Sequence, residues 1–503
     1  MKWWQSKWFK FPVCVLGILV VLATVLWVAG NAWLDKNKKR LIAELAQTVE
    51  EKYFTQIQIG DLHLSWTADF PHLSLVIENV DAKGPLFKQH GHKFFTASEI
   101  FLAIQPSQLL LGKIVFSKTS ISNGNIFIYT DSTGLSNLSF FKSKKAKAKD
   151  QKKPLAIPEE LYIKNFEITI DDRKQEKLFS FLIQKLDAKS KNNGDTTVVK
   201  INKSILVKNF SFNTPRGSFL KNHTLETKIN LRMSNANGSL VWDNAPFKIS
   251  GTPFDISGKF VFTDSPWFAL RINAEAVAYP FAQSLLLPHI SKAMNMVKLS
   301  APVATQTTIE GSLKGKGDPK IVAGWTVKNS MMQTPVLDIS GASFSGYYTN
   351  EIKAGIPRKD SNSRIAVQGL TGNWEGIPIQ SPEIIVSNLT TPQLAGGFSS
   401  SFQLKNFNSI LNGHVAKLLG GEGKLQVSYT GPLKGANRTN ANLQALLTLK
   451  NGSLQLISNP IQLNQCNATI RIDNSTLFLD NLQAKSQNGS AVKITGTALN
   501  AFG

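Results

Sequence analysis

The chain has 503 residues, more than one typical domain needs, so its length predicts several modules or an array of repeats. Only 18% of the residues are charged, but 56 Lys and Arg against 34 Asp and Glu give a net charge of +22. This excess suits nucleic acid or an anionic surface. Because no nucleic-acid-binding motif accompanies it, we expect no nucleic-acid partner. The two cysteines, Cys14 and Cys466, lie in unrelated segments, which excludes a disulfide-stapled fold.

The first element in chain order is an uncharged apolar stretch at 11–34, long enough to cross a bilayer as one helix. A cleaved signal peptide is the alternative, with Gly30-Asn31-Ala32 as its cleavage site, but the stretch is longer than the usual signal-peptide core. Lysines on both sides leave the orientation open. We predict that residues 1–34 form a cytoplasmic tip and a retained transmembrane helix with tryptophans at both interfaces. The anchor residues that we expect are Trp8, Phe11, Leu16, Leu22, Trp27 and Trp33.

A leading helix and a β domain are expected next. Leu41, Leu45 and Val49 recur every four residues, which predicts an amphipathic helix over 35–53. The apolar pattern then changes to a period of two, which is typical of strands with one buried and one wet face. We therefore expect an N-terminal β domain over 35–141, introduced by this helix.

Two Asn-Gly pairs lie between apolar runs and predict tight hairpin turns, at Asn123-Gly124 and at Asn451-Gly452. Spacers rich in Ser, Thr, Asn and Gly recur about every ten residues, which is typical of an antiparallel meander. The fold class that we predict is therefore mainly β.

A basic, low-complexity linker is expected at 142–158, where the run KSKKAKAKDQKKP is too polar to build a core. Contact of this loop with anionic lipid headgroups is an alternative. The remainder, 159–503, is predicted to be a β repeat region interrupted by short helices near 281–297 and 407–419.

Proline or glycine residues are expected to set the boundaries of both predicted helices. Pro288 is expected to divide the first into two, and Gly420-Gly421 is expected to cap the end of the second. Similar Gly-x-Leu phrases follow the two helices. They indicate a weak internal repeat and hence an elongated array.

No constellation of catalytic residues stands out. His90-Gly91-His92 is the closest histidine pair and has no acidic or cysteine neighbours, so an exposed loop explains it better than a metal site. Asp171-Asp172 precedes Arg173 and predicts a charged hairpin turn rather than a catalytic carboxylate pair. No nucleotide-binding loop, hydrolase elbow or zinc-protease motif occurs. We expect no enzymatic activity, no metal ion and no cofactor.

The order of motifs after the apolar stretch carries a resemblance to a known family. IQIGDLHLSW occupies 57–66 and FPHLSLVIENV occupies 70–80; LLLGKIVF follows at 109–116 and ISNGNIFI at 121–128. This order resembles the AsmA-like family of bacterial envelope proteins, which is similar to bridge-like lipid transfer proteins. The resemblance covers the N-terminal part, from the apolar stretch to the end of the predicted β domain.

The resemblance implies a fold and a function. It implies a single-pass protein of the bacterial inner membrane with its bulk in the periplasm, where an elongated antiparallel sheet folds into an apolar groove. The groove would bind phospholipid acyl chains and support lipid transport to the outer membrane and its biogenesis. Membrane phospholipids are the expected partners, with other envelope proteins besides. The groove residues that the alternating pattern predicts are Leu425, Val427, Tyr429, Leu447, Leu449, Ile470 and Ile472.

Two alternatives stay open at this stage. The chain is a scaffold or assembly factor that influences the targeting and assembly of outer-membrane proteins through its sheet edges, or its apolar faces pack on one another as an ordinary sandwich. A groove lined by Leu, Ile, Val and Phe needs no polar chemistry, which agrees with the absence of a catalytic motif. The sequence ends in mid-pattern, as expected of a fragment or a short family member.

Overall fold

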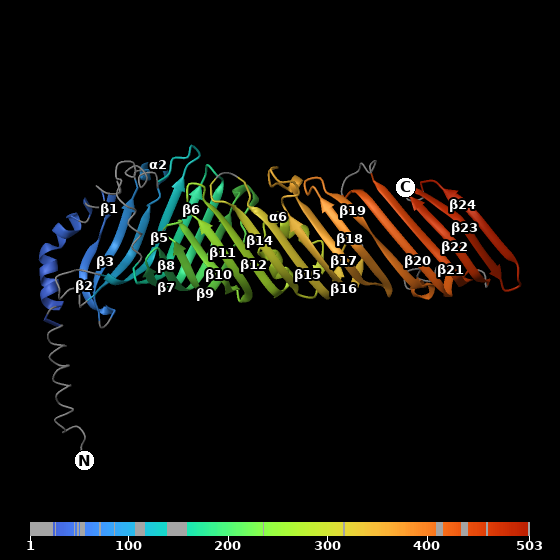
Figure 1. The fold of residues 1–503 in the computed structure, drawn as a ribbon, viewed down its shortest axis with the longest axis horizontal. Coiled ribbons are helices and arrows are strands. Elements are labelled where there is room, and N and C mark those ends of the chain that lie inside the picture. Colours follow the sequence, from blue (N-terminus) through green and yellow to red (C-terminus); the bar gives the residue numbers. More distant parts are fainter. Residues whose placement is uncertain are drawn as a thin grey trace, which may run out of the picture. The chain divides into compact units, whose positions relative to one another are not determined.

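A computed structural model describes residues 24–500 apart from 26, 45, 48–49, 51–55, 70–71, 85, 106–115, 138–157, 235, 315–316, 336, 409–415, 434–440 and 459–460. Strands account for most of these residues, and the prediction of a mainly β fold is confirmed (Figure 1). The chain divides into two compact units. The first is built from the segment before Pro253 together with 257–266, and the second mainly from 267–313 and 317–503. Strand β11 (Thr252–Val261) contributes residues to both.

The first unit contains a ladder of strands, the helix α2 and the 3-10 helix η3. Its elements are β1 (Gln56–Gln58), β2 (Asp61–Asp69), β3 (His72–Lys83), α2 (Phe87–His90), β4 (Phe95–Ile104), β5 (Phe116–Thr130), β6 (Glu160–Asp172), β7 (Lys177–Asn193), β8 (Thr196–Ser211), η3 (Thr214–Arg216), β9 (His223–Ser234) and β10 (Ser239–Ile249). From β2 to β10, strands that are consecutive in sequence pair with one another. The turn predicted at Asp171-Asp172 is confirmed, because it joins the hairpin of β6 and β7.

One pair in this ladder is parallel. Strand β5 pairs with β6 in parallel, with Ile121 opposite Ile163, whereas every other pairing named above is antiparallel. Parallel neighbours require a crossover connection, and the chain between Thr130 and Glu160 makes it. The linker predicted at 142–158 belongs to this connection and lies outside the described residues up to 157.

A helix over 27–44 runs along the edge strand β2, as the blue part of Figure 1 shows. The Asn31 side chain donates to the carbonyl of Leu64 at 3.1 Å and accepts a hydrogen bond from the Leu64 amide at 3.0 Å. The indole of Trp27 donates to the same carbonyl at 3.0 Å. The helix predicted from residue 35 therefore begins earlier, within the apolar stretch, and no proline between 27 and 44 interrupts it.

No helix in the described residues has both the length and the apolar character needed to cross a membrane. The span predicted at 11–34 lies outside the described residues from 11 to 23 and at 26, so it stays a prediction. Its last part, around Trp27 and Trp33, belongs to the helix that contacts β2.

Three strands of the first unit each contain an asparagine whose backbone is in the left-handed conformation. Asn79, Asn123 and Asn165 have φ of 51°, 51° and 49°. Asn165 donates to the side-chain oxygen of Asn123 at 2.9 Å across the β5–β6 pair, and Ser98 donates to the Asn123 carbonyl at 3.0 Å. On β3 and β4 the ladder passes from the Glu78–Glu99 pair to the Val80–Ala97 pair without a change of register, so one residue of each strand is left out. The pairings of β5 with β4 and β6 leave out Asn123 in the same way.

The hairpin turns predicted at Asn123-Gly124 and Asn451-Gly452 are wrong. Asn123 lies inside β5, and Asn451 lies inside β21 (Asn442–Leu456) with φ of 51°. An Asn-Gly pair supplies a residue with positive φ, which both a tight turn and a bulge require. Asn451-Gly452 lies at a register shift of the β21–β22 pairing, and Asn123 lies where the ladder leaves out one residue within β5.

The second unit contains another ladder, with short helices at its start. Its elements are β12 (Trp267–Val277), α5 (Tyr279–Ser284), α6 (Pro288–Met294), β13 (Lys298–Leu299), β14 (Val303–Ser312), β15 (Lys320–Gln333), β16 (Asp338–Thr349), η4 (Asp360–Asn362), β17 (Arg364–Trp374), β18 (Ile377–Ser387), β19 (Gln393–Gln403), η5 (Leu404–Phe407), β20 (Ala416–Pro432), β21, β22 (Gln462–Asp473), β23 (Thr476–Ser486) and β24 (Ala491–Ala498). Its strands pair antiparallel from β14 to β24.

The helices of the second unit differ in part from the prediction. The segment 281–297 contains α5 and α6, and Pro288 begins the second of them, as expected of a proline in the first turn. The helix predicted over 407–419 is wrong at its C-terminal end, because Ala416 onward belongs to β20. Gly421, with φ of 106°, is not a helix cap but lies at an irregularity of the β20–β21 pairing.

The main core of the second unit lies on one face of β14–β18. Val327, Ala342 and Phe344 are buried there, and Tyr279 of α5 packs against them from the side. The Tyr279 hydroxyl donates to the carbonyl of Met294 at 3.0 Å, which ties α5 to α6. The two short helices therefore cover part of the apolar face where the ladder begins.

Candidate functional site

In the first unit, directly paired residues form apolar rows that cross the strands, and paired residues share a face of the sheet. One row consists of Leu62, Ile77, Ile100, Ile121, Ile163, Leu186, Lys203, Thr227 and Phe247. The next consists of Leu64, Leu75, Leu102, Thr119, Leu161, Ala188, Ile201 and Ile229. A third, beyond the residues that the ladder leaves out, consists of Val80, Ala97, Gly124, Phe166, Ile183, Ile205, Leu225 and Ile249.

These rows include many side chains that are only partly buried. Ile77, Ile100, Ile121 and Ile163 each keep intermediate exposure, although each has apolar neighbours on both adjacent strands. A close-packed core would bury them more completely. The rows therefore form a broad apolar surface that remains partly accessible.

The opposite face of the same strands carries ion pairs, and we refer to it as the polar face. Lys208 contacts Glu167 at 2.7 Å and Lys189 contacts Glu160 at 2.7 Å. Burial raises the pKa of the Glu167 carboxyl, but hydrogen bonds from Lys208 and Ser180 lower it by more, so its net pKa lies below the usual value. These two lysines thus have carboxylate partners.

Lys203 is the charged residue within the three apolar rows. It lies on β8 opposite Leu186 on one side and Thr227 on the other. Its Nζ lies 6.0 Å from the ring centroid of Phe247, close enough for a cation–π contact. Desolvation lowers the pKa of its ammonium, and no charged neighbour among the described residues opposes this shift.

In the second unit, the predicted groove residues come together on one face. Leu425 on β20 lies opposite Leu447 on β21, which lies opposite Ile470 on β22. Val427 and Ile472 both lie opposite Ala445. All of these predicted residues keep intermediate exposure.

The polar neighbours along these strands occupy the other face. Lys424, Gln426 and Ser428 are exposed and alternate with the apolar set on β20. The rows continue to β23 and β24, where Ile470 lies opposite Leu479 and Leu479 lies opposite Gly496. The strand period thus places the predicted set on one apolar surface.

A short segment packs against one end of this surface. Leu404 of η5 and Phe402 are buried, and Leu425, Leu447 and Leu449 pack against their cluster. The Phe402 ring lies over Gly423, where an added Cβ would come within 2.6 Å of it. Along the same strands, Val427 and Ile472 lie beyond this cluster and stay partly exposed.

The two histidines singled out in the sequence lie on the polar face of the first unit. The His92 ring stacks on Phe127 with centroids 4.0 Å apart, and His90 lies 4.9 Å from the Tyr129 ring. Burial, and then the nearby His92, lower the pKa of His90. Within the described residues, no cluster of three or more His, Cys, Asp or Glu could hold a metal ion.

A depression beside these histidines lies over polar residues. Lys93, Lys208, Glu167, Asn125 and Thr96 line it. Lys93 is already paired with Asp81 at 2.6 Å, and Lys208 with Glu167. Both lysines of this depression therefore have carboxylate partners, and it does not offer a free charge.

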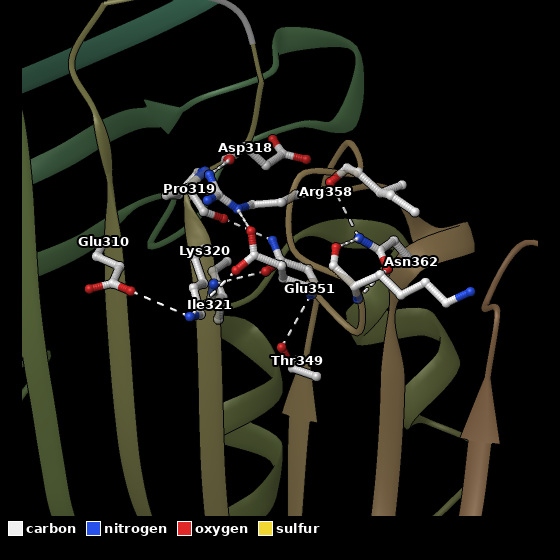
Figure 2. Close-up of polar contacts among 12 residues, drawn as sticks. Glu310, Asp318, Pro319, Lys320, Ile321, Thr349, Glu351, Arg358 and Asn362 are labelled. Atoms are coloured by element: carbon white, nitrogen blue, oxygen red, sulfur yellow. Dashed lines mark hydrogen bonds and ion pairs between the residues drawn. The ribbon is translucent and has the colours of Figure 1, made fainter.

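A charged cluster in the second unit supports the loop between β16 and β17. Figure 2 shows Glu351 between Lys320 and Arg358, with contacts of 3.4 and 2.9 Å. Lys320 also contacts Glu310 at 3.6 Å. The Asn362 side chain donates to the carbonyl of Lys353 at 3.0 Å. Because its charges are mutually compensated, we interpret this cluster as structural.

The predicted anchor residues are only partly described. Trp8, Phe11, Leu16 and Leu22 lie outside the described residues. Trp33 is 57% exposed, while Trp27 is 37% exposed and donates to Leu64. The structure therefore places these two tryptophans on a helix beside the first unit.

Lys203 is the residue that sequence analysis missed, although its signal is present. Val199, Ile201, Ile205 and Val207 occupy every second position of β8, and Lys203 stands at the central position of that series. A lysine in phase with the apolar residues of a strand differs from a lysine in the polar phase, such as Lys200.

Among known proteins, no family model, curated protein or solved structure matches the chain.

Proposed function

We propose that this chain is an AsmA-like, membrane-anchored protein of the bacterial envelope that binds phospholipid acyl chains along the apolar faces of its sheets. In this proposal the segment 11–34 is the inner-membrane anchor, and the β units lie in the periplasm. The protein supports lipid transport to the outer membrane. It needs no catalytic residue, because the task is to shield hydrocarbon from water.

The partly exposed apolar rows are the observation that carries this proposal. Hydrocarbon chains match such a surface in chemistry, and each CH₂ group removed from water contributes about 0.8 kcal/mol. Monomeric proteins seldom expose large contiguous apolar areas unless something binds there. In the second unit the rows through Leu447 and Leu425 extend across successive strands to β24, so a chain has a continuous path.

A charge placed in the path tests the proposal. Val427 lies on the apolar face of β20, and Gln426 beside it is exposed on the polar face. Val427→Glu should reduce the phospholipid that co-purifies with the full-length protein, because an unpaired charge in an apolar site is costly. Gln426→Glu is the matched control and should retain it. Lipid is quantified by mass spectrometry of organic extracts, and the β signal in circular dichroism shows that both variants fold.

The results separate the proposal from the scaffold alternative. Phospholipid that accompanies the wild type and Gln426→Glu but is depleted in a folded Val427→Glu supports acyl-chain binding. A wild-type preparation without phospholipid above the level of an unrelated membrane-anchored protein contradicts it. A scaffold that acts through its sheet edges is then the better explanation.

A further inference from the structure

Lys203 lies among apolar side chains, where a charged ammonium is energetically unfavourable. Its cross-strand neighbours are Leu186 and Thr227, and Ile201 and Ile205 flank it on its own strand and face. Two outward-facing lysines of the same unit have carboxylate partners, Lys208 with Glu167 and Lys189 with Glu160. Among the described residues, Lys203 makes a ring contact with Phe247 and has no acidic partner.

The cation–π contact alone does not balance the charge. At 6.0 Å from the Phe247 centroid, the Nζ is at the outer limit of an effective contact, which contributes about 0.5–1 kcal/mol at exposed sites. Lys203 keeps intermediate exposure, and partial desolvation of its ammonium among apolar side chains without a counter-ion is unfavourable. An anion bound from outside the chain would supply the missing partner.

We propose that Lys203 binds the phosphate of a phospholipid headgroup whose acyl chain lies over the adjoining apolar residues. This inference rests on the proposed function and assigns a headgroup site to the first unit. A lysine ammonium is a compact point charge that suits a phosphate oxygen. Ile201, Ile205 and Leu186 around it provide the hydrocarbon contact. The combination favours a ligand with both a phosphate and an alkyl chain over either alone.

The test uses the full-length protein in amphipol and two probes below their micelle concentrations. Dodecyl phosphate carries both features, and dodecanol carries the chain alone. Equilibrium dialysis should show that the wild type binds dodecyl phosphate about tenfold more tightly, since hydrogen bonds to charged groups contribute about that much. Inorganic phosphate at the same concentration should not displace dodecyl phosphate, because it lacks the apolar contacts.

Variants assign the preference to this lysine. Lys203→Met keeps the length and apolar stem, so it should bind both probes equally, whereas Lys203→Arg should retain the preference for dodecyl phosphate. Lys200→Met removes an exposed lysine of the same strand and should leave the preference unchanged. Circular dichroism and the unfolding midpoint show that each variant is folded.

The outcomes separate this inference from the function on which it rests. Equal binding of both probes by the wild type, or a tenfold preference that persists in Lys203→Met, overturns the headgroup site and leaves acyl-chain binding intact. Displacement by inorganic phosphate overturns the lipid source and indicates a free-anion site. Failure of both probes to bind overturns the proposed function as well.

Discussion

The Asn31 side chain makes the two hydrogen bonds with the Leu64 backbone that a neighbouring strand would otherwise make. Its side-chain amide exchanges two hydrogen bonds with the backbone of this one residue, at 3.0 and 3.1 Å, as an adjacent strand would. Asn408 makes the same exchange with Leu418 on β20, at 2.7 and 2.8 Å. Strand edges otherwise present unpaired groups that recruit other chains. In both units, then, an asparagine side chain satisfies the free side of a strand.

Loss of this amide should loosen the helix from the sheet. Asn31→Ala removes both hydrogen bonds to Leu64, and we expect docking to weaken by about 1–2 kcal/mol. Hydrogen–deuterium exchange should then increase at the Leu64 amide and in the helix over 27–44. Asn37→Ala is the control, because Asn37 donates only within its helix, to the Trp33 carbonyl at 2.8 Å. Equal exchange in the two variants would contradict the edge-pairing role.

The ion pair between Lys38 and Asp61 gives the same contact a pH dependence. Lys38 of the helix contacts Asp61 of β2, and its hydrogen bond lowers the pKa of the Asp61 carboxyl below 3.8. Because the pKa of Asp61 is lower in the folded than in the unfolded state, the ion pair stabilises the protein fully above pH 3.8. This stabilisation is lost as the pH falls through the folded-state pKa of Asp61.

Asp61→Asn tests this dependence against the wild type. Because the pair is partly exposed, we expect a difference of at most about 1 kcal/mol in unfolding free energy at pH 7. The difference should diminish as the pH falls below 3.8, because protonation of Asp61 makes the wild-type side chain neutral, as the amide is in the variant. Urea unfolding over a series of pH values from 7 downward measures it, and a difference that stays constant along the series would exclude the ion pair as its cause.

The irregularity of β5 at Asn123 depends on a backbone conformation that few residues adopt. With φ of 51°, Asn123 is in the left-handed region. Asn123→Ala should destabilise the first unit by about 1–2 kcal/mol, because a Cβ without a compensating hydrogen bond is strained there. Asn123→Gly relieves the strain and loses only the hydrogen bond with Asn165, so it should be the more stable variant. An Ala variant as stable as the Gly variant in urea unfolding would show that position 123 is not under this constraint.

The strand pattern was predictable because the period of two is a local signal. Leu425, Val427 and Tyr429 alternate with polar residues, and the structure places them on one face of β20. The bulges were less predictable, since Asn-Gly pairs meet the backbone requirement of both turns and bulges. In β3 the apolar set runs Leu75, Ile77 and then Val80, so the phase resets across Asn79.

Other features depend on contacts that no local pattern encodes. The parallel β5–β6 pair arises from a long connection, and nothing within either strand specifies its partner. Lys203 could have been found by tracking its phase with Ile201 and Ile205, but its neighbours Leu186 and Thr227 come from other strands. The end of the helix predicted over 407–419 was misplaced because Gly420-Gly421 suits a helix cap as well as a strand irregularity.

Site-specific photocrosslinking in cells tests the central claim most directly. Leu447 lies on the apolar face of β21 opposite Ile470, and its neighbour Leu446 is 37% exposed on the other face. The two positions share a strand and a residue type, so they form a matched pair. A photoreactive benzoylphenylalanine in place of Leu447 should yield phospholipid adducts by mass spectrometry, and the same group in place of Leu446 should not. Equal adducts at both positions, or none at Leu447, would contradict the assignment of this face as the lipid-binding surface.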